Sequence, residues 1–416
     1  MPQVARNLSA AVAAETRINP VAFTDALAIG AMCMAAGLAR LALWVWGRGV
    51  LRLTLPESGF SPSAIIVYLQ GMLGDVSVHL PAILAVHQKF PNASLTCVCC
   101  SEGFPLMPLL EGLPYISKVI VIREQPVVRS GLRLVFSNSE LAELQGDLFI
   151  NLSPFSNRGV PGFVAREMAF AYKCKIRRYL GDRFTLYGTA QCLKRAKRFL
   201  VRNEPRRAWQ ILRPLGIVPH ENASTAFPQW HPGVSSESSA VSMIAAPYAV
   251  LNPGAKFSVQ LWPAENFGRV AAYLDEKYGY GLIVTGSARE YEIGEKVRFH
   301  SGERALNLCG KTSIPELIGL LGRAEIVITN DTGTMHLSSL LNRPTVAIFG
   351  TRMSVKHWFP AGKRTSALFC YHENSFSYDD TGAVPHHLEL IRVTDVCAEI
   401  DCLLSERDPD PENAHF

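Results

Sequence analysis

The sequence has few charged residues and no strong excess of either sign. Charged side chains make up 19% of the 416 residues, and the formal net charge is only +5. This balance gives no reason to expect a nucleic-acid partner, and it suits an acidic substrate or a membrane face equally well. Hydrophobic residues make up 48%, which argues against a disordered chain. We therefore expect a globular protein long enough for two domains.

The chain also lacks the paired cysteine spacing of a zinc site. Its ten cysteines are scattered, and Cys97, Cys99 and Cys100 lie in a strand-like run. This distribution indicates reduced core thiols of a cytosolic protein. Asp379 and Asp380 form an adjacent acidic pair, but their SYDDTG context is typical of a loop turn. We expect no metal site and no other cofactor.

An apolar run near the N-terminus covers residues 26–46. It has no polar side chain before Arg40, and Trp44, Trp46 and Arg48 follow. A spanning helix needs about 20 apolar residues, and an arginine inside it is costly. Tryptophan and arginine suit the headgroup region, so the run predicts a helix that lies on a membrane surface. A weakly inserted helix and a helix packed on its own domain or a dimer partner are the alternatives; a secretory signal is disfavoured because the run starts late.

Two series of apolar runs alternate with helical segments, which is the rhythm of parallel βα units. The expected strands are 63–69, 94–100, 117–122 and 147–152 in the first series and 248–252, 281–286, 325–330 and 344–350 in the second. Residues 203–246 are rich in proline, serine and polar residues and indicate a linker with a helix at its start. The expected division is an N-terminal segment 1–60, a domain 61–225, a linker 226–247, a domain 248–405 and a tail 406–416. The fold class is α/β, with a ligand cleft at the carboxyl ends of the strands.

The most informative segment is EIVITNDTGTMHLSSLLNRPTVAIFG, residues 325–350. An apolar strand stops at Asn330, and a helical pattern begins after the turn formed by Asp331, Thr332, Gly333 and Thr334. A strand that turns tightly into a helix leaves the first N–H groups of the helix pointing into the turn. This is a seat for an anion, most often a phosphate. The alternative is that Asp331 and Thr332 only cap the helix.

Two further segments have the same strand, loop and helix form. In YLQGMLGDVSVHL, Gly71 and Gly74 permit a tight turn and close approach of a ligand, and Asp75 follows at the helix start, at the mouth of the expected cleft. In LNPGAKFSVQLWPAENF, Pro263 lies near a helix start, and Lys256 is placed to reach an anion held in the cleft. Each pattern is weak by itself, since a carboxylate at a helix start and a lysine in a loop are common.

Together the three segments resemble glycosyltransferase family 9, the ADP-heptose:lipopolysaccharide heptosyltransferases. The matching stretches are LGDVSVHLPAI (73–83), LNPGAKFSVQLWPAENF (251–267) and NLCGKTSIPELIGLLGRAEIVITNDTGTMHLSSLLNRPTVAIFG (307–350), and the resemblance covers about residues 62–405. It implies a GT-B fold of two Rossmann-like domains, with the nucleotide sugar held mainly by the second. It also implies inversion at the anomeric carbon without a catalytic metal.

The resemblance assigns roles to particular residues. The catalytic base falls on Asp75, the diphosphate turn on Asp331, Thr332 and Gly333, and the helix histidine on His336. Candidates for contacts to the nucleoside, which are less traceable, are Gly286, Ser287, Glu290, Leu308 and Lys311.

Two positions depart from the family pattern. Gln260 stands where a basic residue commonly contacts the donor phosphate, so Lys256 is the candidate to replace that charge. His79 stands where the family often has threonine, beside Gly71 and Gly74 in the loop expected to face the acceptor. If Lys256 does not replace the charge, stabilisation of the leaving group is weaker or the donor differs.

The sequence therefore predicts a transferase at the cytoplasmic face of a membrane. It would move a sugar from a nucleoside diphosphate sugar, with Asp75 as base, to a glycan or lipid-linked acceptor. Residues 26–46 would hold it at the membrane surface. Two alternatives remain open: a catalytically weakened nucleotide-sugar-binding subunit of a glycan-assembly complex, and a nucleotide-sugar 2-epimerase of the same architecture.

Overall fold

The computed structural model describes two stretches almost without a break, residues 54–100 and 247–350. It also describes residues 110–122, 144–153, 204–218 and 387–405, and parts of 127–135, 168–181 and 358–369. The contacts within the chain divide it into an N-terminal unit, Met1–Ala223, and a C-terminal unit, Ser224–Phe416. The apolar run 26–46, the pair Asp379 and Asp380 and the expected tail all lie outside the described residues.

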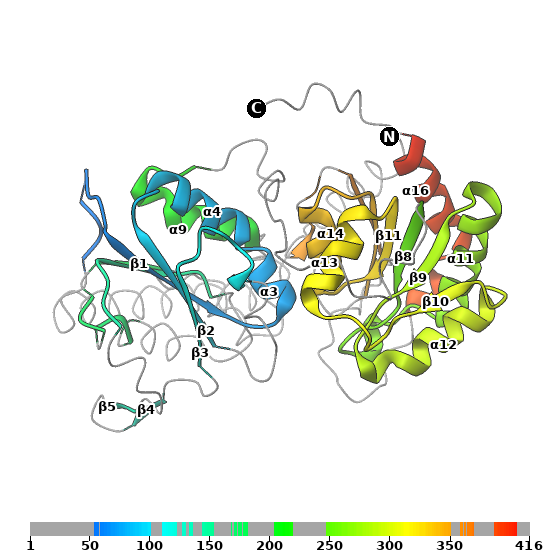
Figure 1. The fold of residues 1–416 in the computed structure, drawn as a ribbon, viewed down its shortest axis with the longest axis horizontal. Coiled ribbons are helices and arrows are strands. Elements are labelled where there is room, and N and C mark those ends of the chain that lie inside the picture. Colours follow the sequence, from blue (N-terminus) through cyan, green and yellow to red (C-terminus); the bar gives the residue numbers. More distant parts are fainter. Residues whose placement is uncertain are drawn as a thin grey trace, which may run out of the picture. The chain divides into compact units, whose positions relative to one another are not determined.

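The C-terminal unit is built on a six-stranded parallel sheet (Figure 1). The strand order is β10-β9-β8-β11-β12-β13. The strands are β8 (Tyr248–Asn252), β9 (Gly281–Val284), β10 (Ala305–Asn307), β11 (Ile326–Asn330), β12 (Thr345–Phe349) and β13 (Thr365–Phe369). Every residue of β8, β11 and β12 is buried, as expected for central strands covered on both faces.

Helices cover both faces of this sheet. In Figure 1, α13 (Ile314–Arg323) and α14 (Gly333–Leu340) lie on one side, and α11 (Ala264–Tyr278), α12 (Tyr291–His300) and α16 (Val393–Ser405) lie on the other. Short 3₁₀ turns are η5 (Ser258–Gln260), η6 (Ala288–Glu290) and η7 (His387–Leu390). Local sequence sets several ends: Ser313 and Glu316 form a capping box at the start of α13, and Gly279, with φ of 67°, ends α11.

The N-terminal unit has a five-stranded parallel sheet of order β3-β2-β1-β6-β7. Its strands are β1 (Ala64–Gln70), β2 (Ser94–Cys100), β3 (Lys118–Ile122), β6 (Leu148–Asn151) and β7 (Arg178–Leu180). A separate antiparallel pair is formed by β4 (Val127–Arg129) and β5 (Arg133–Val135). Thr54 forms a parallel bridge with Arg178, and the Tyr179 N–H donates to the Thr54 carbonyl at 2.9 Å. The chain therefore joins the edge of the sheet at residue 54.

The segment after β1 forms two helices. The first, α3 (Leu73–Ser77), ends at Val78, and α4 (Leu80–Lys89) begins afresh with Pro81 in its first turn. The helix expected at the start of the linker is α9 (Glu204–Leu212), followed by η3 (Arg213–Leu215). It lies beside α4 in Figure 1, and its Ala208, Ile211 and Leu212 are buried. This part of the polar 203–246 region therefore belongs to the core of the N-terminal unit.

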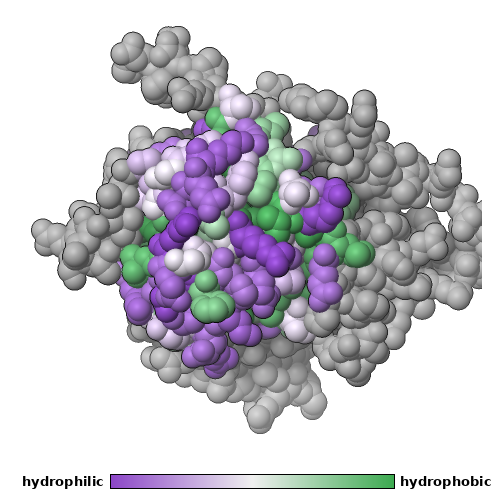
Figure 2. Space-filling view, turned by 90° about the vertical axis from the view of Figure 1, so that its right-hand side faces the viewer, coloured by the Kyte–Doolittle hydropathy of each residue, from purple (hydrophilic) through white to green (hydrophobic). Residues whose placement is uncertain are grey.

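The face of the C-terminal unit that carries α11 and α12 is covered mainly by hydrophilic residues, with hydrophobic ones in smaller patches (Figure 2). Phe299 and Leu306 are among the exposed hydrophobic residues. On this unit the Asp401 carboxylate ties α16 to α11, because it accepts hydrogen bonds from Tyr273, Tyr278 and Lys277 at 2.6–2.7 Å. Within the described part of the chain, no helix is both long and apolar enough to cross a bilayer.

Candidate functional site

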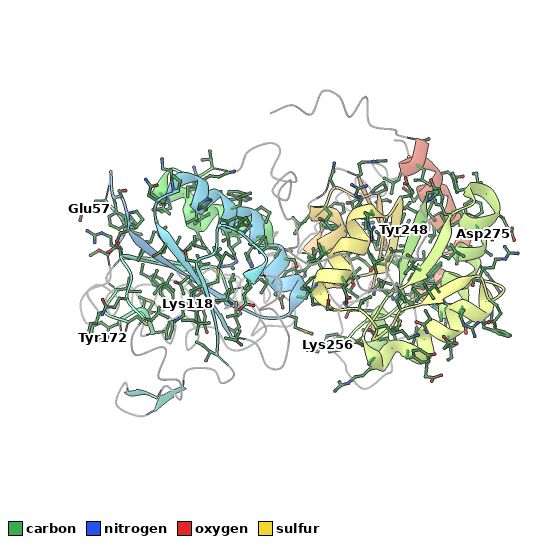
Figure 3. The ribbon with its side chains drawn as sticks, in the orientation of Figure 1. Glu57, Lys118, Tyr172, Tyr248, Lys256 and Asp275 are labelled. Atoms are coloured by element: carbon green, nitrogen blue, oxygen red, sulfur yellow. The ribbon has the colours of Figure 1, made fainter. Side chains whose placement is uncertain are left out.

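The second sheet reverses its strand order between β8 and β11. β8 is followed outward by β9 and β10 on one side, and β11 by β12 and β13 on the other. In open parallel sheets the carboxyl ends of the two strands at such a switch point flank the ligand crevice. Figure 3 labels Tyr248 and Lys256, which lie near opposite ends of β8, so that Lys256 marks the carboxyl edge. The turns after Asn252 and Asn330 are thus neighbours at this edge.

Side chains at the ends of β8 and β11 support the turn at Thr332. The Thr332 hydroxyl donates to Asn252 Oδ1 at 3.2 Å and lies 3.3 Å from the Thr329 hydroxyl. The Asn252 amide in turn donates to the Thr285 carbonyl at 2.9 Å. On the other side of the turn, Asn330 Nδ2 donates to the Pro253 carbonyl at 2.7 Å. This buried network holds the backbone of the turn in one conformation.

Thr332 is the residue that precedes α14, yet its side chain does not cap the helix. Its hydroxyl is used by the network below the turn, and it makes no hydrogen bond to the helix N–H groups. The first N–H groups of an α-helix have no partner inside the helix, and an uncapped N-terminus favours an anion. The capping alternative for Thr332 therefore lacks its hydrogen bond.

Gln260 contacts Asp331 at the same edge. The side chain of Gln260 is buried, and its Nε2 donates to Asp331 Oδ2 at 3.0 Å. Asp331 also continues the sheet, because its N–H donates to the Ile348 carbonyl at 3.0 Å. The residue that replaces a basic side chain in the sequence pattern is therefore engaged with a carboxylate of the turn.

The two other donor-side candidates differ in their surroundings. His336 is buried in α14, and its ring lies 6.0 Å from the ring of Trp358. Burial lowers the pKa of His336 to about 4, so the imidazole is neutral near pH 7 and supplies no positive charge. Lys256 is exposed, with its Nζ 5.5 Å from the centre of the Phe257 ring. Of these two residues, only Lys256 offers a cation.

The candidates for nucleoside contacts follow β9 and β10. The Glu290 carboxylate accepts from the Ser287 N–H at 2.6 Å, and it packs so closely on Gly254 that a Cβ there would overlap it. The Gly310 N–H donates to the Gly286 carbonyl at 2.8 Å, which joins the two loops. Lys311 is turned back, since its Nζ donates to the Asn307 carbonyl at 3.1 Å. Leu308 is buried in the core; its N–H donates to the Val284 carbonyl at 2.8 Å, and its carbonyl accepts from the Lys311 N–H at 2.9 Å.

In the N-terminal unit, Asp75 lies at the first turn of α3. Its Oδ2 accepts a hydrogen bond from the Met72 N–H at 2.7 Å. Its backbone carbonyl oxygen lies 2.7 Å from His79 Nδ1. Gly71 has φ of +122°, and a Cβ at this position would overlap the Asp75 side chain. Glycine at 71 is therefore needed for both the backbone and the carboxylate. His79 is fully buried, so its side chain packs under the loop and is not exposed at its surface.

Several residues at the sheet edges were not predicted from the sequence. Asn252, Thr329 and Asn330 form the support of the Thr332 turn described above. In the N-terminal unit, the buried Arg207 of α9 donates to the carbonyls of Leu152 and Ser153 at 3.1 and 2.6 Å, at the carboxyl end of β6. Asn252 and Asn330 stand at the ends of predicted strands, and this position is the signal that could have identified them. Among the described residues, no group of three or more histidine, cysteine, aspartate or glutamate side chains is placed to hold a metal ion.

Residues 219–381 match the sequence profile of glycosyltransferase family 9 (heptosyltransferase). Lipooligosaccharide heptosyltransferase 2 of Haemophilus influenzae is 35% identical over 103 residues, which are 24% of this chain and 30% of that protein. The alignment thus spans about a third of the length of this relative. The resemblance predicted from the three sequence segments is confirmed for the C-terminal unit.

Solved structures match a larger part of the chain. The ADP-heptose lipopolysaccharide heptosyltransferase II of Escherichia coli has a TM-score of 0.56 at 21% identity, covering 82% of this chain and 98% of that one. A family 9 glycosyltransferase of Veillonella parvula has a TM-score of 0.61 at 20% identity, covering 83% and 98%. At these identities the likeness concerns the fold, and it confirms an α/β chain with two parallel sheets of the GT-B kind.

Proposed function

Residues 219–381 belong to glycosyltransferase family 9, and from this premise we propose that the whole chain is an inverting, metal-independent glycosyltransferase. The donor is a nucleoside diphosphate sugar, with ADP-linked heptose as first choice because structural relatives are named for ADP-heptose. The acceptor is a lipopolysaccharide-type or other glycan. The observation that carries the proposal is the start of α14, which the Thr332 side chain does not cap, at the switch point of the C-terminal sheet and inside the matched residues.

The proposed reaction is a single displacement. Asp75 takes the proton of an acceptor hydroxyl while that oxygen forms a bond to the anomeric carbon. The bond from this carbon to the diphosphate oxygen breaks at the same time, and the nucleoside diphosphate leaves with the electron pair. The N–H groups at Thr332 and Gly333 then stabilise the charge that develops on the leaving group. Lys256 is the candidate cation, and the neutral His336 contributes at most a hydrogen bond.

The donor is tested by the thermal stability of the full chain with ADP, UDP or GDP. A ligand at one hundred times its dissociation constant raises the free energy of unfolding by about 2.7 kcal/mol. We expect ADP to raise the melting temperature most. No shift with any of the three nucleotides would refute the proposed donor class, and a larger shift with UDP or GDP would refute ADP.

Gln260 favours one alternative, a nucleotide-sugar-binding subunit with little catalysis, because it brings no positive charge to the donor side. The release of free sugar from the donor in the absence of acceptor separates the two functions. A transferase lets water replace the acceptor at a low rate, whereas a binding subunit releases no sugar.

Membrane association through residues 26–46 stays a prediction, because the segment lies outside the described residues. A surface helix would concentrate the enzyme near a lipid-linked acceptor at the cytoplasmic face. A truncated chain that tests this prediction must keep Thr54, because this residue pairs with the edge of the N-terminal sheet at Arg178.

We expect a chain without residues 1–52 to melt cooperatively and bind ADP as before, but to lose cosedimentation with anionic liposomes. Arg40, Arg48 and Arg52 each contribute about 1 kcal/mol of attraction near an anionic surface. Their triple replacement by glutamine in the full chain is the matched control, and should weaken binding to anionic vesicles more than to neutral ones. A truncated chain that still cosediments, or that loses its cooperative melt, would contradict the prediction.

A further inference from the structure

The 3₁₀ turn η5 lies in the loop after β8 and contacts the turn after β11 through a hydrogen bond. Gln260, its last residue, is 7% exposed, although glutamine is usually a surface residue. Its Nε2 lies 3.0 Å from Asp331 Oδ2 and 3.4 Å from the Asp331 carbonyl oxygen. The two residues are 71 positions apart in the chain, so this contact joins two separate loops of the edge.

Gly350, directly after β12, provides the space for this turn. A Cβ on Gly350 would lie 2.5 Å from the Val259 carbonyl oxygen and 2.9 Å from Gln260 Cα. Both atoms belong to the backbone, so neither can move aside without shifting η5. The ends of β8, β11 and β12 are therefore packed together at one point, which brings the Gln260 amide to Asp331.

We propose that Gln260 is a positioning residue for the donor: its amide holds the Asp331 carboxylate aside so that the adjacent seat stays open to the diphosphate. This inference rests on the proposed function. A carboxylate next to an anion-binding site repels a bound diphosphate if the carboxylate can turn toward that site. A hydrogen bond from a neutral amide fixes the carboxylate without placing a second cation at the site. Gln260 thus acts through Asp331 and need not touch the donor phosphate.

Replacement of Gln260 by glutamate turns this contact into a pH-dependent one. Two carboxylates in contact cannot both ionise easily, so one proton is held with a raised pKa. At about pH 8 both groups are charged, and we expect ADP to bind Gln260→Glu roughly 10-fold or more weakly than wild type. At about pH 5 a proton shared between the introduced carboxylate and Asp331 forms the hydrogen bond that the Gln260 amide makes in wild type. The affinity of the variant for ADP should then return to within about threefold of wild type.

The ratio of variant to wild-type affinity is the quantity to measure, by titration calorimetry with ADP, because it cancels the titration of the nucleotide itself. The charged and titratable groups described on neighbouring elements include Lys256 in the same loop, Glu290 against Gly254 in that loop, His336 on α14, and Arg392 with Asp395 at the start of α16. His336 is neutral because burial lowers its pKa to about 4, and the Arg392 guanidinium lowers the pKa of Asp395. The introduced pair is therefore the expected source of any change in the ratio between pH 5 and 8.

Ser258→Glu is the matched control, since Ser258 is exposed on the same turn. It adds the same charge two residues from Gln260, and its affinity ratio should stay constant with pH. Gln260→Met keeps the size of the side chain but loses the amide, so it should weaken ADP binding at every pH. Gly350→Ala, which displaces η5 from the other side, should do the same.

The outcomes separate this inference from the proposed function. A wild-type protein that binds none of ADP, UDP and GDP overturns the proposed function and the inference with it. Wild-type binding together with a constant ratio for folded Gln260→Glu, or with unchanged affinity for folded Gln260→Met, overturns the positioning role alone. Cooperative melting at both pH values shows that each variant is folded.

Discussion

The Asp75→Asn protein is expected to lose sugar transfer by about 10²- to 10⁴-fold while it binds ADP as tightly as wild type. The asparagine oxygen can still accept the hydrogen bond that Asp75 Oδ2 takes from the Met72 N–H at 2.7 Å, so the start of α3 keeps its cap. The amide has the shape of the carboxylate but almost no proton affinity. The loss would therefore be chemical, and it should appear in single-turnover transfer at saturating donor.

Asp147→Asn is the control for the substitution itself. Asp147 lies in the same unit but at the start of β6, where its carboxylate accepts from the Ser63 N–H and hydroxyl at 2.6 and 2.7 Å. We expect this variant to lose some stability and to keep transfer. The separate variant Gly71→Ala should also reduce transfer, because a Cβ at position 71 overlaps the Asp75 side chain. Near-normal turnover by a folded Asp75→Asn protein would rule out Asp75 as the base.

A carboxylate at the first position of α14 should exclude the donor. Gly333 is not among the described glycines with positive φ, so its backbone accepts a side chain. An aspartate in the first turn favours the helix by about 0.3–1 kcal/mol. The same charge occupies the seat proposed for the diphosphate and repels it, so we expect ADP to bind Gly333→Asp at least about 30-fold more weakly. Stability and binding should thus change in opposite directions, as measured by thermal melting and calorimetry.

Gly322→Asp makes the same change elsewhere in the C-terminal unit. Gly322 lies near the end of α13, and nothing lies within 4 Å of a Cβ built there. A carboxylate near a helix C-terminus is mildly unfavourable, and ADP binding should be unchanged. Thr332→Ala should be milder than Gly333→Asp, because it removes the hydroxyl contact to Asn252 but leaves the backbone N–H groups. ADP affinity at the wild-type level in folded Gly333→Asp would place the diphosphate elsewhere.

The main strands were predictable because they are short apolar runs between turn residues. Residues 325–330 and 344–350 were expected as strands, and β11 and β12 occupy 326–330 and 345–349. In the sheet of the C-terminal unit, β10 and β13 were missed. β10 has only three residues and lies at the sheet edge, and its Leu306 is exposed, so no apolar run marks it. Pairing with β9 and β12, respectively, defines these two strands.

The sequence by itself determined the α/β class, the turns that end the strands, and the family resemblance, because apolar runs, glycines and motif spacing are local properties. Only the tertiary structure decided which turns meet: the order of the strands places Asn252 against Thr332 and Gln260 against Asp331, across 80 and 71 residues. It also decided the state of His336, whose imidazole is neutral because packing removes it from water. Contacts and pKa values of this kind depend on strand order and burial, which are set by the packing of the whole unit and not by any short stretch of sequence.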